Sequence, residues 1–380
     1  MIVPTPTDTV RRSGAIAIAR VLCILGVVYV HAWTGLNGEA LERLRGTPQE
    51  TLRWVLMEAM GRSAVPLLGM LSGWLVAGST RTRNWSDHVR RKARTVLAPM
   101  LIWNAIAILL VSGVAWAGLL AAPIPQSWGW LAQEMLILSR NPDINVQMPF
   151  LRDLFLCMVA APLFVRLPSW TLLTVGAVAG AAHIFGLGPP LLMRASILCF
   201  FLIGMVARRT DLADRIVAVP LLLASLPYAV LMPTRLAIAL HPGIAPQLGA
   251  TVDLCARFAA ALFMWRLAWA LVPTRFGSLL RWFEPYAFFL FCAHLILIWL
   301  GGPLIGALTG PLGSPLYPLY LIAQPLLMLA AVVAIVQGLR RVAPALTDWL
   351  SGGRLGAADQ AETRAASNAM AKLRLRASKS

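Results

Sequence analysis

A series of about ten apolar runs, most of them close to the length of a membrane-spanning helix, constrains the fold of this chain more than any other feature. A helix needs about 20 predominantly apolar residues to cross a bilayer, and in lipid its backbone polar groups must be bonded within the segment itself. The sequence therefore predicts an all-α integral membrane protein with about ten transmembrane helices. The predicted spans are residues 14–35, 63–79, 95–118, 150–166, 170–187, 191–207, 216–233, 249–272, 283–301 and 319–339.

The composition excludes a soluble protein of ordinary kind. Apolar residues make up 58% of the chain and charged residues only 13%, whereas soluble domains carry about 25% charged residues. The first apolar run is also too long for the h-region of a cleaved signal peptide, which has about 7–15 residues, and Arg20 interrupts it. We therefore expect this run to be the first permanent span.

The distribution of basic residues predicts the orientation of the chain in the membrane. The formal net charge is +17, and most of the 33 Lys and Arg residues fall in alternate loops and in the two terminal segments. Such a bias marks the cytoplasmic side of a membrane protein. We predict that both termini are cytoplasmic, that the span number is even, and that the protein lies in a bacterial inner membrane. The basic segments are expected to contact anionic lipids, and no nucleic-acid partner is expected.

The same pattern predicts a simple domain organisation. Residues 1–345 form one transmembrane domain, and residues 346–380 form a basic, disordered cytoplasmic tail. Two segments, 48–61 and 128–138, are expected to lie as helices at the membrane interface. All five cysteines fall in apolar runs, so we expect neither disulfides nor a metal site.

Two ionisable residues within the first span are the sharpest functional candidates, because a charge inside a span is costly. Arg20 and His31 are eleven residues apart, which places both on one face of a helix and separates them by about 17 Å. They would line a polar passage through much of the bilayer. The alternative is that Arg20 extends to the cytoplasmic interface and His31 to the outer one, with purely structural roles.

Further charged residues at the predicted span ends have both functional and structural interpretations. Arg91 and Arg94 are neighbours on a helix, and arginine forks suit phosphate oxygens, although a basic flank of a span would look the same. Asp253 and Arg257 have the spacing of an intrahelical ion pair. His294 lies within the ninth predicted span, where a polar cavity and structural pairing are equally reasonable.

Five segments together resemble the acyltransferase-3 family of bacterial membrane O-acyltransferases. They occur in the family's order, and the resemblance extends over nearly all of the apolar part of the chain, from about Ser13 to Gly353. One departure is Pro149, which stands where the family usually has Trp. The segments are ARVLCILGVVYVH at 19–31, AVPLLGMLSGWL at 64–75, RKARTVLAP at 91–99, PFLRDL at 149–154 and YAFFLFCAH at 286–294.

The resemblance implies a reaction and roles for several residues. The family moves an acyl group, here expected to be acetyl, from cytoplasmic acyl-CoA to a sugar hydroxyl of a surface polysaccharide or its lipid-linked precursor. Arg91, Arg94 and Arg20 would bind the donor, and Arg20 could also stabilise the thioester oxygen. His31 would be the general base, since histidine titrates near neutral pH. Second-tier candidates for acceptor orientation are Arg152, Asp153, Ser72 and His294.

Two other function classes fit the residues on physical grounds. A transporter or flippase of a lipid or glycan would also line a helical bundle with polar groups, although no paired repeat halves are visible in the sequence. A non-catalytic sensor or assembly factor is the third class. No bound cofactor is expected in the acyltransferase interpretation, because acyl-CoA is a substrate. The acceptor glycan, the acyl group and the oligomeric state are not determined by the sequence.

Overall fold

A computed structural model of the chain describes residues 6–62, 64–241 and 243–356, whose regular secondary structure is helical. Six helices are long and apolar enough to cross a membrane. Each of them coincides with a predicted span, so the prediction of an all-α, multi-pass membrane protein is confirmed at this level. They are Thr9–Val30 within α1 (Pro6–Val30), Trp85–Trp116, which joins α5 to α7, and the helices α13 (Leu221–Leu240), α14 (Pro246–Leu271), α15 (Arg275–Thr309) and α16 (Tyr317–Val342).

The other four predicted spans correspond to shorter helices. These are α4 (Val65–Ala77), α9 (Pro149–Phe164), α10 (Ser169–Ile184) and α11 (Ala195–Arg209), which have between 13 and 16 residues. A straight helix of that length is shorter than the hydrocarbon core of a bilayer. The total of ten spans and the cytoplasmic position of both termini therefore stay predictions.

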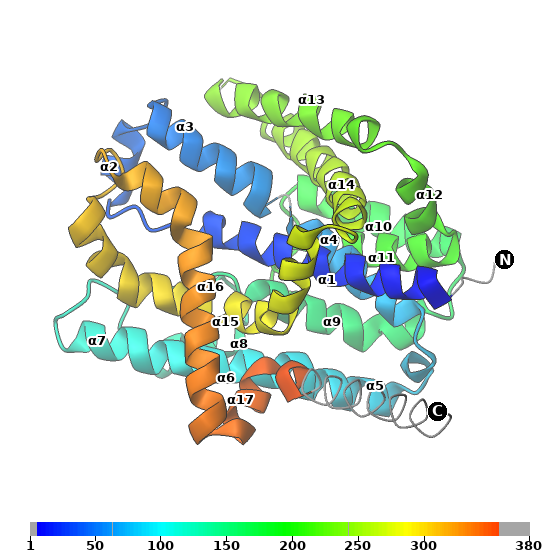
Figure 1. The fold of residues 1–380 in the computed structure, drawn as a ribbon, viewed down its shortest axis with the longest axis horizontal. Helices are drawn as coiled ribbons and strands as arrows, with labels where there is room; N and C mark the ends of the chain where they lie inside the picture. The colour runs from blue at the N-terminus through cyan, green and yellow to red at the C-terminus, as the bar shows by residue number, and fades with distance from the viewer. Residues whose placement is uncertain (1–5, 63, 242, 357–380) are drawn as a thin grey trace, which may run out of the picture.

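Helix α1 occupies the middle of the bundle (Figure 1). It contacts η1 (Leu56–Arg62) and the helices α4, α14, α15 and α16. Small and apolar residues recur along it at helical spacing and are fully or almost fully buried, as Ala15, Ile18, Cys23 and Val28 show. Because other helices pack around this part of α1, its polar side chains lie beside partner residues or internal cavities, as Arg20 and Tyr29 show.

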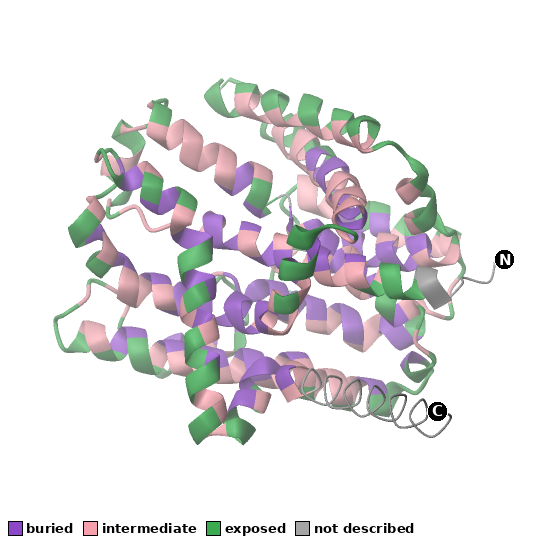
Figure 2. Ribbon diagram, viewed as in Figure 1, coloured by how far each residue is buried: buried purple, intermediate pink, exposed green. Residues whose placement is uncertain are grey.

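The peripheral helix α13 presents the opposite pattern. None of its residues is buried, and the large apolar side chains of Leu222, Leu223 and Val230 are exposed. Figure 2 shows this helix in the colours of exposed and intermediate residues along one edge of the molecule. A long exposed apolar face of this kind suits contact with lipid.

Glycines allow α4 and α11 to approach each other closely. A Cβ added at Gly73 would collide with the carbonyl of Phe201, and one added at Gly204 would collide with the carbonyl of Met70. Small residues at such crossings let helix backbones pack directly in membranes. Gly73 is therefore a packing residue, and its contact fixes the position of α11, which begins at the cavity described below.

Short helices complete the described chain. Both predicted interfacial segments contain one: α3 (Pro48–Val55) is capped by Thr47, whose hydroxyl accepts the N–H of Glu50, and α8 (Trp128–Leu136) is capped by Ser127. Such caps satisfy backbone groups at a helix start. The remaining short elements are α2 (Gly38–Arg43), η2 (Thr80–Arg83) and α12 (Leu212–Ala218), together with η3 (Ala93–Leu97), α6 (Ala98–Ala107) and η4 (Ile108–Ser112), which lie between α5 (Trp85–Lys92) and α7 (Gly113–Trp116).

The C-terminal segment corrects the predicted boundary at residue 345. Helix α17 (Pro344–Ser351) and the residues up to 356 pack against the bundle, where Leu350 and Leu355 are 3% and 1% exposed. The indole of Trp103 donates a hydrogen bond to the carbonyl of Leu350 at 3.0 Å. The two leucines supply the apolar contact that the polar composition of the tail concealed. The rest of the predicted tail, 357–380, lies outside the described residues.

We predict that Gly73→Leu destabilises the fold, because its side chain would force α4 away from α11. Overpacking of this kind costs about 1–3 kcal/mol or more. The measurement is the thermal unfolding temperature of the purified protein in detergent. Gly113→Leu is the matched control, since a side chain there would meet nothing within 4 Å. Equal unfolding temperatures for the two variants would contradict the packing described.

Candidate active site along helix α1

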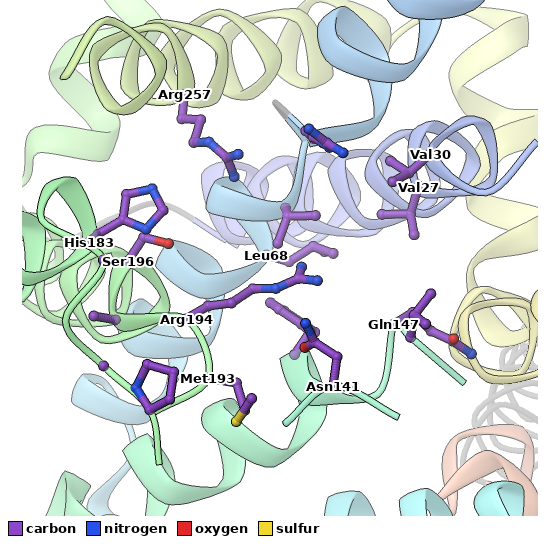
Figure 3. Close-up of a pocket in the computed structure, with 18 of the residues that line it drawn as sticks. Val27, Val30, Leu68, Asn141, Gln147, His183, Met193, Arg194, Ser196 and Arg257 are labelled. Carbon is purple, nitrogen blue, oxygen red and sulfur yellow. The ribbon is translucent and has the colours of Figure 1, made fainter. Parts of the chain in front are cut away.

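A cavity of about 550 Å³ lies at the end of α1 that carries His31. We call it the His31 cavity. His31 follows the last residue of α1, and its backbone N–H still donates to the carbonyl of Val28 at 3.2 Å. Helix α10 contributes His183, α11 contributes Ser196, and α14 contributes Arg257, while Arg194 directly precedes α11 (Figure 3). Helices distant in sequence therefore surround one imidazole.

His294 of α15 lies directly behind His31. The centroids of the two imidazole rings are 5.5 Å apart. His294 is fully buried, and its Nδ1 lies 3.1 Å from the carbonyl of Leu290 and 2.8 Å from that of Phe291. Since carbonyls only accept hydrogen bonds, Nδ1 carries the proton and Nε2 is left as an acceptor. Nε2 has no hydrogen-bond partner among the described residues.

An ion-pair network borders the His31 cavity. Arg62 contacts Glu58 at 2.8 Å, and Arg257 contacts Asp253 at 2.6 Å. Arg235 of α13 contacts both of these carboxylates at 2.6 Å. The predicted intrahelical pair of Asp253 and Arg257 is thereby confirmed. The structure also shows what that spacing could not, namely that three arginines from different segments share two carboxylates.

Arg152 and Asp153 do not line this cavity. Arg152 donates to Asp153 at 2.8 Å and to the carbonyls of Pro190 and Leu191 at 2.8 and 3.0 Å. The buried Asp153 carboxylate accepts the backbone N–H groups of Met193 and Arg194. The pair therefore holds the loop that leads into α11. Its predicted role in acceptor orientation can act only through the residues of that loop.

Two adjoining cavities, of about 170 and 410 Å³, lie beside Arg20, near the middle of α1. We call them together the Arg20 cavity. Both are lined by Arg20, Lys92 and Arg354. Arg20 donates to the carboxylate of Glu284 at 2.8 Å. Glu284 is the one acidic residue among the lining residues, so the Arg20 cavity carries an excess of positive charge.

The two arginines of the predicted donor motif separate in space. Arg91 lines the Arg20 cavity. Arg94 is exposed and does not line it; its guanidinium lies 5.1 Å from the centroid of the Trp349 ring on α17. The proximity of Arg91 to the cavity supports its predicted role. Arg94 instead contacts the C-terminal segment, and a direct role in donor binding stays a prediction.

Arg354 is the residue of this site that sequence reasoning missed. Its guanidinium carbon lies 3.7 Å from the centroid of the Phe288 ring, and its Nη1 donates to the carbonyls of Thr95 and Ser351. Burial lowers the pKa of Arg354 to about 10, so the side chain stays charged at neutral pH. It lies 60 residues beyond the last predicted motif, which ends at His294, and no motif marks it. The apolar residues Leu350 and Leu355, which are buried beside it, were the available sequence signal.

Three apolar residues separate the two ends of the site. Leu68, Phe150 and Phe291 line both the His31 cavity and the inner part of the Arg20 cavity. The rings of Phe150 and Phe291 lie 5.7 Å apart between centroids. Ser72 lines the Arg20 side, where its hydroxyl donates to the carbonyl of Leu68 at 2.8 Å. These three side chains, which we call the apolar partition, therefore lie between the His31 imidazole and the positively charged residues of the Arg20 cavity. Among the described residues, no group of three or more His, Cys, Asp or Glu could hold a metal ion.

Comparisons with known proteins point to one family. Residues 14–337 match the model of the acyltransferase-3 family, described as an acyltransferase domain. The chain is also 30% identical over 371 residues to a succinoglycan biosynthesis protein, ExoH, of Rhizobium meliloti (strain 1021). That alignment covers 91% of this chain and 93% of the relative. No solved structure matches the chain significantly.

We predict that the two cavities open to opposite sides of the membrane, since Arg20 and His31 are eleven residues apart, which corresponds to about 17 Å along a helix. Asn141→Cys would place a thiol at the His31 cavity and Ser79→Cys one at the Arg20 cavity. The background is Cys255→Ala, because the other cysteines are buried. A membrane-impermeant maleimide should label one variant in intact cells and the other only in inverted vesicles. Labelling of both from the same side would contradict the arrangement.

Proposed function

The chain belongs to the acyltransferase-3 family, as its motifs predict, and we propose that it transfers an acyl group from cytoplasmic acyl-CoA to a sugar hydroxyl. The acceptor would be a surface or exported polysaccharide, or its lipid-linked precursor. The name of the Rhizobium relative, a succinoglycan biosynthesis protein, supports a polysaccharide acceptor. We further propose a bacterial inner-membrane location, with both termini in the cytoplasm and acetyl as the acyl group.

The single observation that carries this proposal is the division of the site by Leu68, Phe150 and Phe291. A cationic cavity on one side suits the phosphates of CoA. An imidazole on the other side suits activation of a hydroxyl. The extended arm of CoA would pass the apolar partition and present its thioester to His31. A donor and an acceptor could then react without either substrate crossing the membrane.

The donor would be held by charge on the Arg20 side. Arg91, Lys92 and Arg354 would face its phosphates, since Glu284, the one acidic residue of the lining, pairs with Arg20. Glu284 would orient the Arg20 guanidinium toward the passage. The stacking of Arg354 on Phe288 fixes that side chain while leaving its charge in the cavity. Several fixed cations and one carboxylate favour a multiply charged anion over a neutral ligand.

The reaction would proceed by general-base catalysis at His31. A neutral imidazole nitrogen takes the proton of the acceptor hydroxyl while its oxygen attacks the thioester carbon. The oxyanion of the tetrahedral intermediate would be stabilised by a cation of the site. The C–S bond then breaks, and the thiolate of CoA takes the proton from the imidazolium. The products are the O-acyl sugar and free CoA, and His31 returns to its neutral form.

His294 would act behind His31. Its Nδ1–H is committed to backbone carbonyls, which fixes the ring at 5.5 Å from the His31 ring. A fixed neutral ring would hold the His31 imidazole in place by packing, without contact to substrate. His294 is therefore a positioning residue in this proposal.

A transporter or flippase of a lipid or glycan is the competing function. The apolar partition could then be a closed gate between two half-channels. Family membership supports the acyltransferase instead. Consumption of acyl-CoA by the purified protein distinguishes the two, because transport requires no thioester cleavage.

We predict that His31→Ala abolishes acyl transfer while leaving CoA binding intact. Loss of a general base costs about 10²–10⁴-fold in rate. The measurement is acceptor-dependent release of free CoA by purified protein, with CoA affinity measured in parallel. His241→Ala is the control, since His241 is exposed on the loop after α13. Wild-type turnover in His31→Ala would rule out this residue as the base.

We also predict that Arg354→Ala weakens donor binding by about 10–100-fold, since a hydrogen bond to a charged group contributes about 1.5–3 kcal/mol. The readout is the Kd for CoA of the full chain. Arg341→Ala is the matched control, because Arg341 is exposed at the end of α16 and lines neither cavity. Arg354→Lys should restore part of the affinity by restoring the charge. Unchanged Kd in Arg354→Ala would remove the C-terminal segment from the donor site.

A further inference from the structure

We infer that Arg194 forms a binding site for an anionic group next to His31. The group would be a carboxylate or phosphate carried by one of the two substrates. This inference rests on the proposed function, because it concerns what the His31 cavity receives. It goes further in stating that one substrate must carry a negative charge close to its reacting atom.

The lining of the His31 cavity contains positively charged side chains but no acidic ones. Three arginines, Arg62, Arg194 and Arg257, line it, and none of its lining residues is Asp or Glu. Arg62 and Arg257 have carboxylate partners that lie outside the lining. The guanidinium of Arg194 has no hydrogen bond or ion pair with any residue that the structure describes.

The neighbouring carboxylates are already occupied. Glu58 and Asp253 together serve the three arginines of the network at the rim of the cavity. Asp153 pairs with Arg152 through one oxygen and accepts the backbone N–H of Arg194 through the other. Arg194 is therefore an additional positive charge without its own counterion.

Hydrogen bonds from neighbouring residues hold Arg194 in a defined position. The 2.7 Å hydrogen bond from its backbone N–H to Asp153 fixes the residue that precedes α11. Arg152 holds the preceding loop through two carbonyls. Figure 3 shows the Arg194 side chain extended across the cavity, with its guanidinium near the centre of the lining residues. The pair at 152–153 thus aims a cation at the space in front of His31.

An unpaired guanidinium in a membrane domain requires compensation, because charges away from bulk water are costly unless matched. A bound anion would supply that match, and the planar fork of arginine binds carboxylate or phosphate oxygens through two hydrogen bonds. The substrates offer two sources of such a group. One is an acyl chain that ends in a second carboxylate, and the other is an acidic sugar or a phosphate on the acceptor.

The experiment compares wild type with Arg194→Gln in the full-length protein in proteoliposomes. The donor arm sets acetyl-CoA against succinyl-CoA. The acceptor arm sets methyl glucoside against the methyl glycoside of glucuronic acid. We expect Arg194→Gln to lower kcat/KM about 10–100-fold for the charged member of one arm and to change the neutral member by less than about threefold. The arm that responds identifies which substrate carries the anion.

Two further variants keep the test specific. Arg194→Lys should restore part of the activity toward the charged substrate, which a purely structural role would not predict. Arg215→Gln is the control, since Arg215 is exposed on α12 and lies outside the cavity. Equal losses of kcat/KM for charged and neutral substrates in Arg194→Gln, or no loss for any substrate, would overturn the inference.

Failure of the proposed function can be told apart from failure of this site. If the wild type transfers no acyl group at all, the readout becomes the rise in unfolding temperature on adding succinate or glucuronate. A rise in the wild type that disappears in Arg194→Gln supports the anion site even in a protein that is no transferase. The same rise in both proteins, or no rise in the wild type, overturns it.

Discussion

The structure depends on the burial of one helix that carries Arg20 near its middle and is followed directly by His31. Helix α1 is surrounded by α4, α14, α15, α16 and η1, and its apolar residues supply the contacts that hold it there. Arg20 and His31 each lie beside a partner residue or a cavity, which offsets the cost of a polar group within a membrane domain. Arg20 faces Glu284 and a cationic cavity. His31 faces a second cavity, which lies where α1 ends.

The two cavities differ in where their acidic residues lie, and this difference distinguishes one end of the site from the other. Each cavity has more arginine and lysine than acid, although their acids are used differently. Glu284 lies within the Arg20 cavity and orients one cation there. At the His31 end the acids stand outside the lining and hold arginines at its rim. Between the two, Phe150 and Phe291 keep the passage apolar, which suits a thioester better than a charge.

Local patterns in the sequence predicted what short-range geometry determines. The six long spans follow from the length and apolar character of their segments, and the ion pair of Asp253 with Arg257 follows from helical periodicity. Three features did not follow from it. Arg354 reaches the site from a segment read as a polar tail, Arg94 turns to Trp349, and Arg194 stands alone because Asp153 is already bound. Each depends on contacts between residues far apart in the chain, which periodicity does not contain.

The most direct measurement of the central claim is a cryo-EM structure with a non-hydrolysable thioether analogue of acetyl-CoA. The account predicts density for the CoA phosphates among Arg91, Lys92 and Arg354. The arm of CoA should pass between Phe150 and Phe291, and the acetyl carbonyl should lie within hydrogen-bond reach of the space beside His31. Nucleotide density in the His31 cavity, or an acetyl group that stays on the Arg20 side of the two rings, would contradict it.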